Sequence, residues 1–139
     1  MAAHPQPLPH KPIPALDSPA ASAAALRTFF NIAKAWSLSA AEEQRLLGVQ
    51  RSTVYAWRAG EFPARLDADT LERLSYVFGI YSALQVLFPV AERADAWIRK
   101  PNTAPLFGGE SALARMLGGK VADLFEVRRY LDAVRGGVA

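Results

Sequence analysis

Residues 39–60, SAAEEQRLLGVQRSTVYAWRAG, decide how this chain folds. Ser39 and Glu42 have the spacing of a capping box, in which the serine oxygen and the glutamate carboxylate accept hydrogen bonds from exposed backbone amides. They predict a helix that ends at Gly48, where a left-handed backbone conformation costs least. A further helix is expected from about Arg51 to Gly60. The stretch therefore predicts two short helices joined by a glycine turn.

This pattern is typical of a helix-turn-helix, a motif that places its second helix in the major groove of DNA. The spacing points four apolar side chains inward, so that the second helix packs against the first: Leu47, Val49, Val54 and Trp57. Gln44 stands where compact units of this kind have a small residue, which predicts a looser crossing of the two helices.

Six polar residues remain on the outer side of the motif and are the predicted DNA contacts: Gln50, Arg51, Ser52, Thr53, Tyr55 and Arg58. Gln50 and Arg51 stand at the start of the second helix, where glutamine can pair with adenine and arginine with guanine. The hydroxyl groups can bond phosphates, which a helix N-terminus also favours. Outward polar residues are expected of any surface helix, so the motif alone does not exclude an ordinary solvent-exposed helix that does not bind DNA.

The rest of the chain also carries helix signals, and no segment shows the alternation of a strand. Ser18-Pro19 predicts a helix start, and Asp69 to Glu72 is a second capping pattern. A long apolar stripe follows to Phe88, with a possible bend at Gly79. Two short helices, at about 110–117 and 121–134, complete the chain. We therefore expect an all-α fold.

Composition divides the chain into three parts. Residues 1–18 are rich in proline and are expected to be a disordered tail. Residues 19–66 form the predicted helix-turn-helix DNA-binding domain, and residues 67–139 form a second helical domain. The net charge of +3 comes mainly from residues 1–60, which hold six basic and three acidic side chains. A modest positive field of this kind suits contact with phosphates.

Several function classes are excluded by what the chain lacks. It has no cysteine, and its two histidines, His4 and His10, lie in the proline-rich tail. Nothing therefore predicts a metal site, a cofactor or acid–base catalysis, and we expect no enzymatic activity. The longest apolar run, residues 76–90, is shorter than the about 20 residues that a membrane helix needs. We expect a cytoplasmic protein with no membrane contact.

The C-terminal part carries the most specific pattern, W…PN…FGG…ML.G…V..YL. Its residues are Trp97, Pro101, Asn102, Phe107, Gly108, Ala112, Leu113, Leu117, Gly119, Val127, Tyr130 and Leu131. In this pattern and the upstream helix-turn-helix, the chain after about residue 25 resembles the Xre/MbcA/ParS family of antitoxins. Glu110-Ser111 departs from it, since many members have a proline before that helix.

The resemblance implies the antitoxin of a type II toxin–antitoxin system. Such a protein covers the NAD cleft of a RES-domain toxin that consumes or uses NAD, and it represses its own operon through the helix-turn-helix. The resemblance also implies a homo-oligomer, commonly a dimer, within a larger complex with the toxin. Residues 67–139 would then serve oligomerisation and toxin binding. The alternative is a stand-alone repressor whose C-terminal half dimerises or senses a ligand.

The residues of this half suggest different roles. Asn102 is expected to bond its own backbone in a turn, Phe107 to fill a gap between helices, and Gly108-Gly109 to let backbones approach. On the last helix, Val127, Leu131 and Val134 are expected to face the core. The charged residues left outside are the predicted toxin contacts: Arg128, Arg129, Asp132 and Arg135. Arginine pairs with phosphate-like and acidic groups, although a solvated helix end would show the same residues.

Overall fold

The computed structural model describes residues 18–136, so the predicted disorder of residues 1–17 lies outside the described residues. Within this range the chain forms α-helices and one 3-10 turn, and no strand, as the sequence predicted. The elements are α1 (Pro19–Ala35), α2 (Ala40–Leu47), α3 (Arg51–Arg58), α4 (Ala68–Leu87), α5 (Ala91–Ala96), η1 (Trp97–Arg99), α6 (Ala112–Met116) and α7 (Val121–Arg135).

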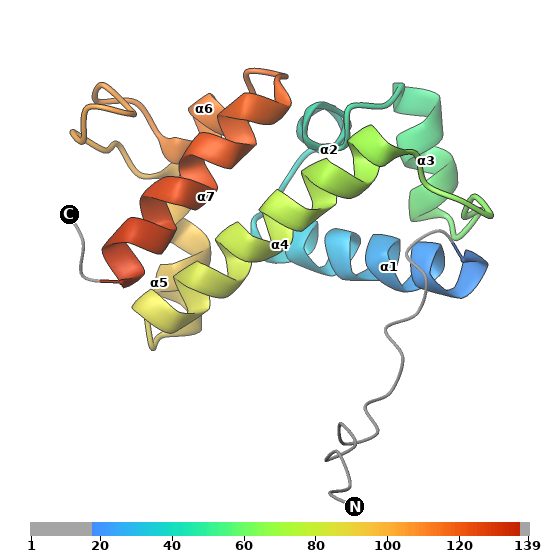
Figure 1. Cartoon of the computed structure of the whole chain (residues 1–139), viewed down its shortest axis with the longest axis horizontal. Coiled ribbons are helices and arrows are strands. Elements are labelled where there is room, and N and C mark those ends of the chain that lie inside the picture. The colour runs from blue at the N-terminus through green and yellow to red at the C-terminus, as the bar shows by residue number, and fades with distance from the viewer. Residues whose placement is uncertain (1–17, 137–139) are drawn as a thin grey trace, which may run out of the picture.

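Helix α4 runs diagonally through the molecule and is shared by its two halves (Figure 1). It packs against α1 and α2 of the N-terminal half and, most extensively, against α7 of the C-terminal half. Its side chains belong to one core that includes residues from both halves, among them Leu26 of α1 and Leu131 of α7. The two halves are therefore joined through a common helix.

Helix α4 is continuous from Ala68 to Leu87, so Gly79, the position of the possible bend, does not interrupt it. Gly79 has a different role in the fold. A Cβ atom at this position would collide with the guanidinium of Arg128, which comes from α7. The missing side chain thus lets Arg128 lie across α4, where its Nη1 donates to the carbonyl of Ser75 at 3.4 Å.

The helix starts follow the local signals with one exception. The Ser18 hydroxyl accepts from the amide of Ala21 at 3.1 Å, and the capping box of Ser39 and Glu42 is present in full. The predicted capping pattern at Asp69 is wrong. The carboxylate of Asp67 caps α4 instead, by accepting from the amide of Thr70 at 2.8 Å. This hydrogen bond is the main reason that the pKa of Asp67 is lowered.

The segment between η1 and α6 is a closed loop held by its own backbone. The carbonyl of Asn102 accepts from the amide of Gly109 at 2.8 Å, and the side chain of Asn102 accepts from Ala104 at 2.9 Å, as the turn chemistry predicted. Phe107 is buried and packs edge-on against Trp97 of η1 and Tyr130 of α7, with ring centroids 6.0 and 5.1 Å away, so it fills the space between these helices as predicted.

The expectation that Gly108 and Gly109 allow a close backbone approach is wrong. A Cβ atom at either glycine would have no neighbour within 4 Å. Both residues instead have positive φ angles, 59° and 92°, which side chains other than glycine rarely tolerate. They are needed to reverse the chain direction, so that the loop can close on Asn102.

A buried arginine connects the two halves at the turn of the helix-turn-helix. Arg73 of α4 is 8% exposed. Its guanidinium donates to the carbonyl of Arg45 in α2 at 3.3 Å, to the carbonyl of Gly119 between α6 and α7 at 3.0 Å, and to Asp69 at 2.8 Å. A Cβ atom on Gly48 would lie 2.6 Å from the Nε of Arg73. The glycine turn therefore rests directly on this side chain.

We expect the substitution Arg73→Ala to lower the free energy of unfolding by about 2–4 kcal/mol, because it leaves two carbonyls without their buried donor. Urea unfolding followed by circular dichroism measures this change. Arg115→Ala is the matched control, since the side chain of Arg115 is 40% exposed in its ion pair with Asp123, and its loss should cost less than about 1 kcal/mol. Equal losses for the two variants would show that water replaces Arg73 at both carbonyls.

Candidate nucleic-acid interface and the α7 surface

Helices α2 and α3 form the predicted helix-turn-helix. Leu47 and Val54 are completely buried between them and the core, and Val49 and Trp57 are partly buried, so the inward positions are confirmed. Gly48 makes the turn with φ of 68°. The carbonyl of the Gln44 side chain accepts from the Nε of Arg51 at 3.4 Å. The larger residue is thus accommodated by a contact with the start of α3.

The side chains predicted to touch DNA lie on the outer side of α3 and at its start. Five are exposed and Thr53 is half-buried. Tyr55 exposes 52% of its surface, which is unusual for a large ring in a packed helix pair. Gln50 precedes α3 without any side-chain cap, so no side chain accepts from the first amides of the helix. These amides and the helix dipole favour a bound anion such as a phosphate.

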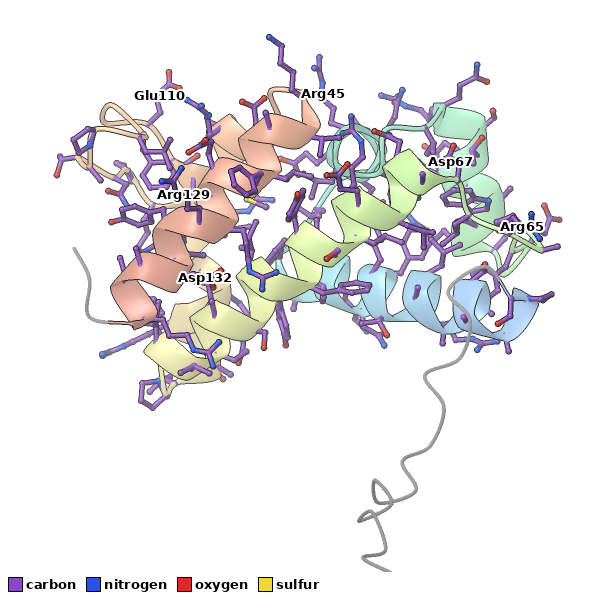
Figure 2. The ribbon with its side chains drawn as sticks, viewed as in Figure 1. Arg45, Arg65, Asp67, Glu110, Arg129 and Asp132 are labelled. Atoms are coloured by element: carbon purple, nitrogen blue, oxygen red, sulfur yellow. The ribbon has the colours of Figure 1, made fainter. Side chains whose placement is uncertain are left out.

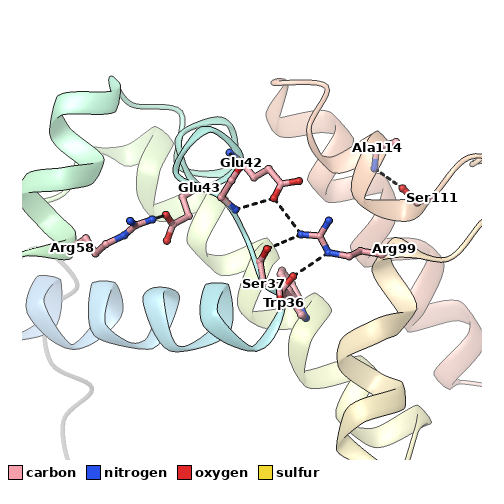
Figure 3. A network of polar contacts seen from close by, with 9 residues as sticks. Trp36, Ser37, Glu42, Glu43, Arg58, Arg99, Ser111 and Ala114 are labelled. Atoms are coloured by element: carbon pink, nitrogen blue, oxygen red, sulfur yellow. Dashed lines mark hydrogen bonds and ion pairs between the residues drawn. The ribbon is translucent and has the colours of Figure 1, made fainter.

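Arg58 has a second role that the sequence did not reveal. Its guanidinium forms an ion pair with Glu43 of α2, and Glu43 is only 3% exposed (Figure 3). A buried carboxylate without a partner would be costly, so Arg58 holds α3 against α2 by neutralising it. The Cζ atom of Arg58 also lies 5.8 Å from the centre of the Tyr55 ring. A charged residue at an inward position of α2, Glu43, was the only sequence signal for this pair.

A further arginine joins the C-terminal half to the helix-turn-helix. Arg99 donates to the carbonyls of Trp36 and Ser37 at 3.1 and 2.9 Å, and to the carboxylate of Glu42 at 3.2 Å (Figure 3). It therefore closes the C-terminal end of α1 and touches the capping box of α2. Burial raises the pKa of Glu42, but the Ser39 amide and the Arg99 guanidinium outweigh it and leave the pKa below its usual value.

The charged residues predicted to bind a toxin lie along α7. Arg129 and Asp132 project from the helix surface (Figure 2), and Arg135 is exposed as well. Arg128 is different, because its guanidinium lies across α4 and its Nε donates to Asp132 at 3.0 Å. Arg129 lines a hollow with Leu106 and Tyr130, whereas Arg135 lies on the side of Arg128, with which it lines another hollow.

Two of the three predicted core positions of α7 are confirmed. Val127 and Leu131 are buried, whereas Val134 exposes 42% of its surface. The prediction for Val134 is wrong, because the last turn of α7 lies at the edge of the molecule (Figure 1). An apolar side chain is thus exposed among the charged residues of this turn.

Within residues 18–136 there is no group of three or more histidine, cysteine or carboxylate side chains that could hold a metal ion. In the same range, no helix is long and apolar enough to cross a membrane.

Comparison with known proteins matches both halves of the chain. Residues 15–79 match the antitoxin Xre-like helix-turn-helix domain, and residues 83–137 match the antitoxin Xre/MbcA/ParS C-terminal toxin-binding domain. A protein of Sinorhizobium fredii (strain NBRC 101917 / NGR234), named "Uncharacterized protein y4oB", is 50% identical over 115 residues, which are 82% of this chain and 86% of that protein. Its name assigns no function.

The fold and the matched domains define a non-enzymatic regulatory protein, with a helix-turn-helix for DNA and a helical domain for a toxin. The chain belongs to the Xre/MbcA/ParS family of antitoxins, as the sequence pattern indicated. The two matched regions meet within α4, the helix that packs against both halves.

We expect the substitution Glu42→Gln to reduce stability at neutral pH and to make stability less sensitive to acid. The lowered pKa of Glu42 means that its contribution is present above the usual glutamate value of about 4.3 and is lost as the pH falls through the folded-state pKa. Thermal unfolding between neutral and acidic pH measures the difference between the two proteins. The difference in stability between the wild-type protein and the variant should become smaller as the pH falls. Parallel curves, like those expected for the control Glu92→Gln in α5, would contradict this assignment.

Proposed function

We propose that this antitoxin inhibits a RES-domain toxin that consumes NAD, and that it represses the promoter of its own operon in the cytoplasm. The observation that carries the proposal is the exposure of two arginines on α7, Arg129 and Arg135, in the half that matches a toxin-binding domain. The same chain presents an uncapped α3 with exposed polar residues. In a type II system of this kind, the toxin and the antitoxin are both proteins.

On the DNA side, Gln50 and Arg51 are proposed to read base edges in the major groove. Ser52, Thr53 and Tyr55 would bond phosphates, and Arg58 would combine its ion pair to Glu43 with a contact to the backbone. A single copy offers few cations, so its affinity should be weak and should fall steeply with salt. A homodimer would read two half-sites about 34 Å apart and would gain affinity through effective concentration.

On the toxin side, Arg129 and Arg135 are proposed to make the main contacts. A cleft that accepts the pyrophosphate of NAD suits guanidinium groups, which pair with phosphate-like and carboxylate acceptors. Arg128 and Asp132 would hold the helix in place, since Asp132 accepts from Arg128 at 3.0 Å within α7 and Arg128 also donates to the carbonyl of Ser75 in α4 at 3.4 Å. The proposal of a RES-domain partner rests on the family resemblance, and that of the contact surface on exposure and charge.

We expect the double substitution Arg129→Glu, Arg135→Glu to release the toxin. After co-expression with the product of a neighbouring RES-domain gene, the wild-type complex should be stable and should consume no NAD. The double variant should bind the toxin weakly, and NAD consumption should return. Point substitutions are preferred to removal of residues 125–139, because removal would also delete Val127 and Leu131 from the core.

Arg93→Glu on α5 is the matched control, since it reverses an exposed charge outside the proposed surfaces. A double variant that still forms a complex inactive on NAD would contradict the proposed contact surface. A wild-type complex that consumes NAD would contradict inhibition of the toxin. If no complex forms while the protein still protects DNA upstream of its gene, the chain is a stand-alone repressor.

A further inference from the structure

A polar hollow of about 400 Å³ lies where the two halves meet beside the recognition helix. It is formed by α2, by the turn to α3 and by the turn between α6 and α7: Ala41, Gln44, Arg45, Gly48, Val49, Arg51 and Gly119. Two arginines line it and no carboxylate does. One of them, Arg51, is a proposed base contact, and the other, Arg45, lies outside the residues proposed so far to bind DNA.

The charges around this hollow are not neutralised. Within residues 18–136, Arg45 and Arg51 form no ion pair, although most buried or bridging arginines do, among them Arg58, Arg73 and Arg99. Unpaired cations that share one hollow raise the local positive potential and attract an anion.

A third cation, Lys120, follows directly after Gly119 in the turn between α6 and α7 that lines the hollow. The carbonyl of Gly119 accepts from Arg73, and the Nη1 of Arg45 lies 3.5 Å from the carbonyl of Leu117. Lys120, the next residue after Gly119, is exposed, and its side chain makes no capping contact. The tertiary contacts therefore bring the turn that carries Lys120 beside α2, although the two are far apart in the sequence.

The carboxylate nearest to Lys120 in the chain does not cancel its charge. Asp123 accepts weakly from the amide of Lys120, at 3.4 Å, while its other oxygen forms an ion pair with Arg115 at 3.2 Å. Asp69, which lies near the same junction, is paired with Arg73. These two carboxylates are therefore paired with other arginines, and the surface around the hollow is positively charged.

We propose that the turn between α6 and α7 belongs to the DNA-binding surface, and that Arg45 and Lys120 contact backbone phosphates beside the base contacts of α3. In a helix-turn-helix the second helix enters the major groove and the first crosses the DNA backbone. Arg45 lies on that first helix, on the same hollow as Arg51, so it faces the strand that borders the groove. The toxin-binding half then supplies part of the DNA affinity through Lys120. This inference rests on the proposed DNA binding.

The test is the salt dependence of binding to two probes: a duplex from the region upstream of the gene and a mixed-sequence duplex of equal length. The slope of log affinity against log salt, over about 50 to 200 mM, should become shallower by about 0.9 for each lost phosphate contact. Arg45→Gln and Lys120→Gln should each show this change, and the double variant about twice as much. Affinity should fall in the same proportion for both probes, because phosphates carry no sequence information.

Three further variants make the result specific. Arg45→Lys keeps the charge and should keep the slope, which a purely structural role of the arginine would not predict. Arg93→Gln on α5, at the other end of α4 from α3 (Figure 1), should leave the slope unchanged. Arg51→Gln should weaken binding to the upstream duplex more than to the mixed-sequence duplex, because it removes a base contact.

The outcomes separate this inference from the proposed function. If Arg51→Gln impairs binding while the Arg45→Gln, Lys120→Gln double variant keeps the wild-type slope, the helix-turn-helix binds DNA without the turn and the inference is overturned. If the wild-type protein binds neither duplex, DNA binding itself is wrong and the inference falls with it. Retention of the wild-type thermal transition in each variant excludes unfolding as the cause.

Discussion

The guanidinium of Arg73 is the interaction on which the arrangement of the two halves depends. A buried cation is tolerated only when acceptors surround it, and here they come from α2, α4 and the turn between α6 and α7. None of these three segments can move alone without leaving donors or carbonyls unpaired. The turn of the helix-turn-helix also rests on the same side chain, because Gly48 has no Cβ to displace it. The helix-turn-helix and the toxin-binding domain are thereby held in a fixed orientation relative to each other.

Two other arginines also connect the two halves of the molecule. Arg99 reaches from η1 to the end of α1 and the start of α2, and Arg128 reaches from α7 across α4 at Gly79. In each case a long side chain with several donors satisfies backbone carbonyls that a helix end or a helix surface leaves available. Arginine suits this task better than lysine, because its planar guanidinium can donate to several acceptors at once. The antitoxin thus uses arginine both as a structural connector and as an exposed ligand-binding group.

Local signals explain which parts of the fold could be predicted. Ser18, Ser39 and Gly48 act on their own helix ends within a few residues, so their roles follow from spacing alone. The inward positions of α2 and α3 follow from helical periodicity in the same way. Asp67 and Asp69 illustrate the limit, since both are plausible caps and only the position of Arg73 decides that Asp69 forms an ion pair. The role of Gly79 could not be predicted locally, because Arg128, which occupies the space beside it, is distant in the sequence.

The sequence by itself determined the all-α class, the helix-turn-helix and the antitoxin family, because these depend on capping, periodicity and a local residue pattern. Only the tertiary structure decided which charged residues are free to bind a partner. Arg58 and Arg128 looked equivalent to Arg51 and Arg129 in the sequence, yet the first two are engaged by Glu43 and by Asp132. The same structure brought Gly119, the residue before Lys120, beside Arg45. The physical reason is that the availability of a charge depends on every group within a few ångströms, and folding sets those neighbours across the whole chain.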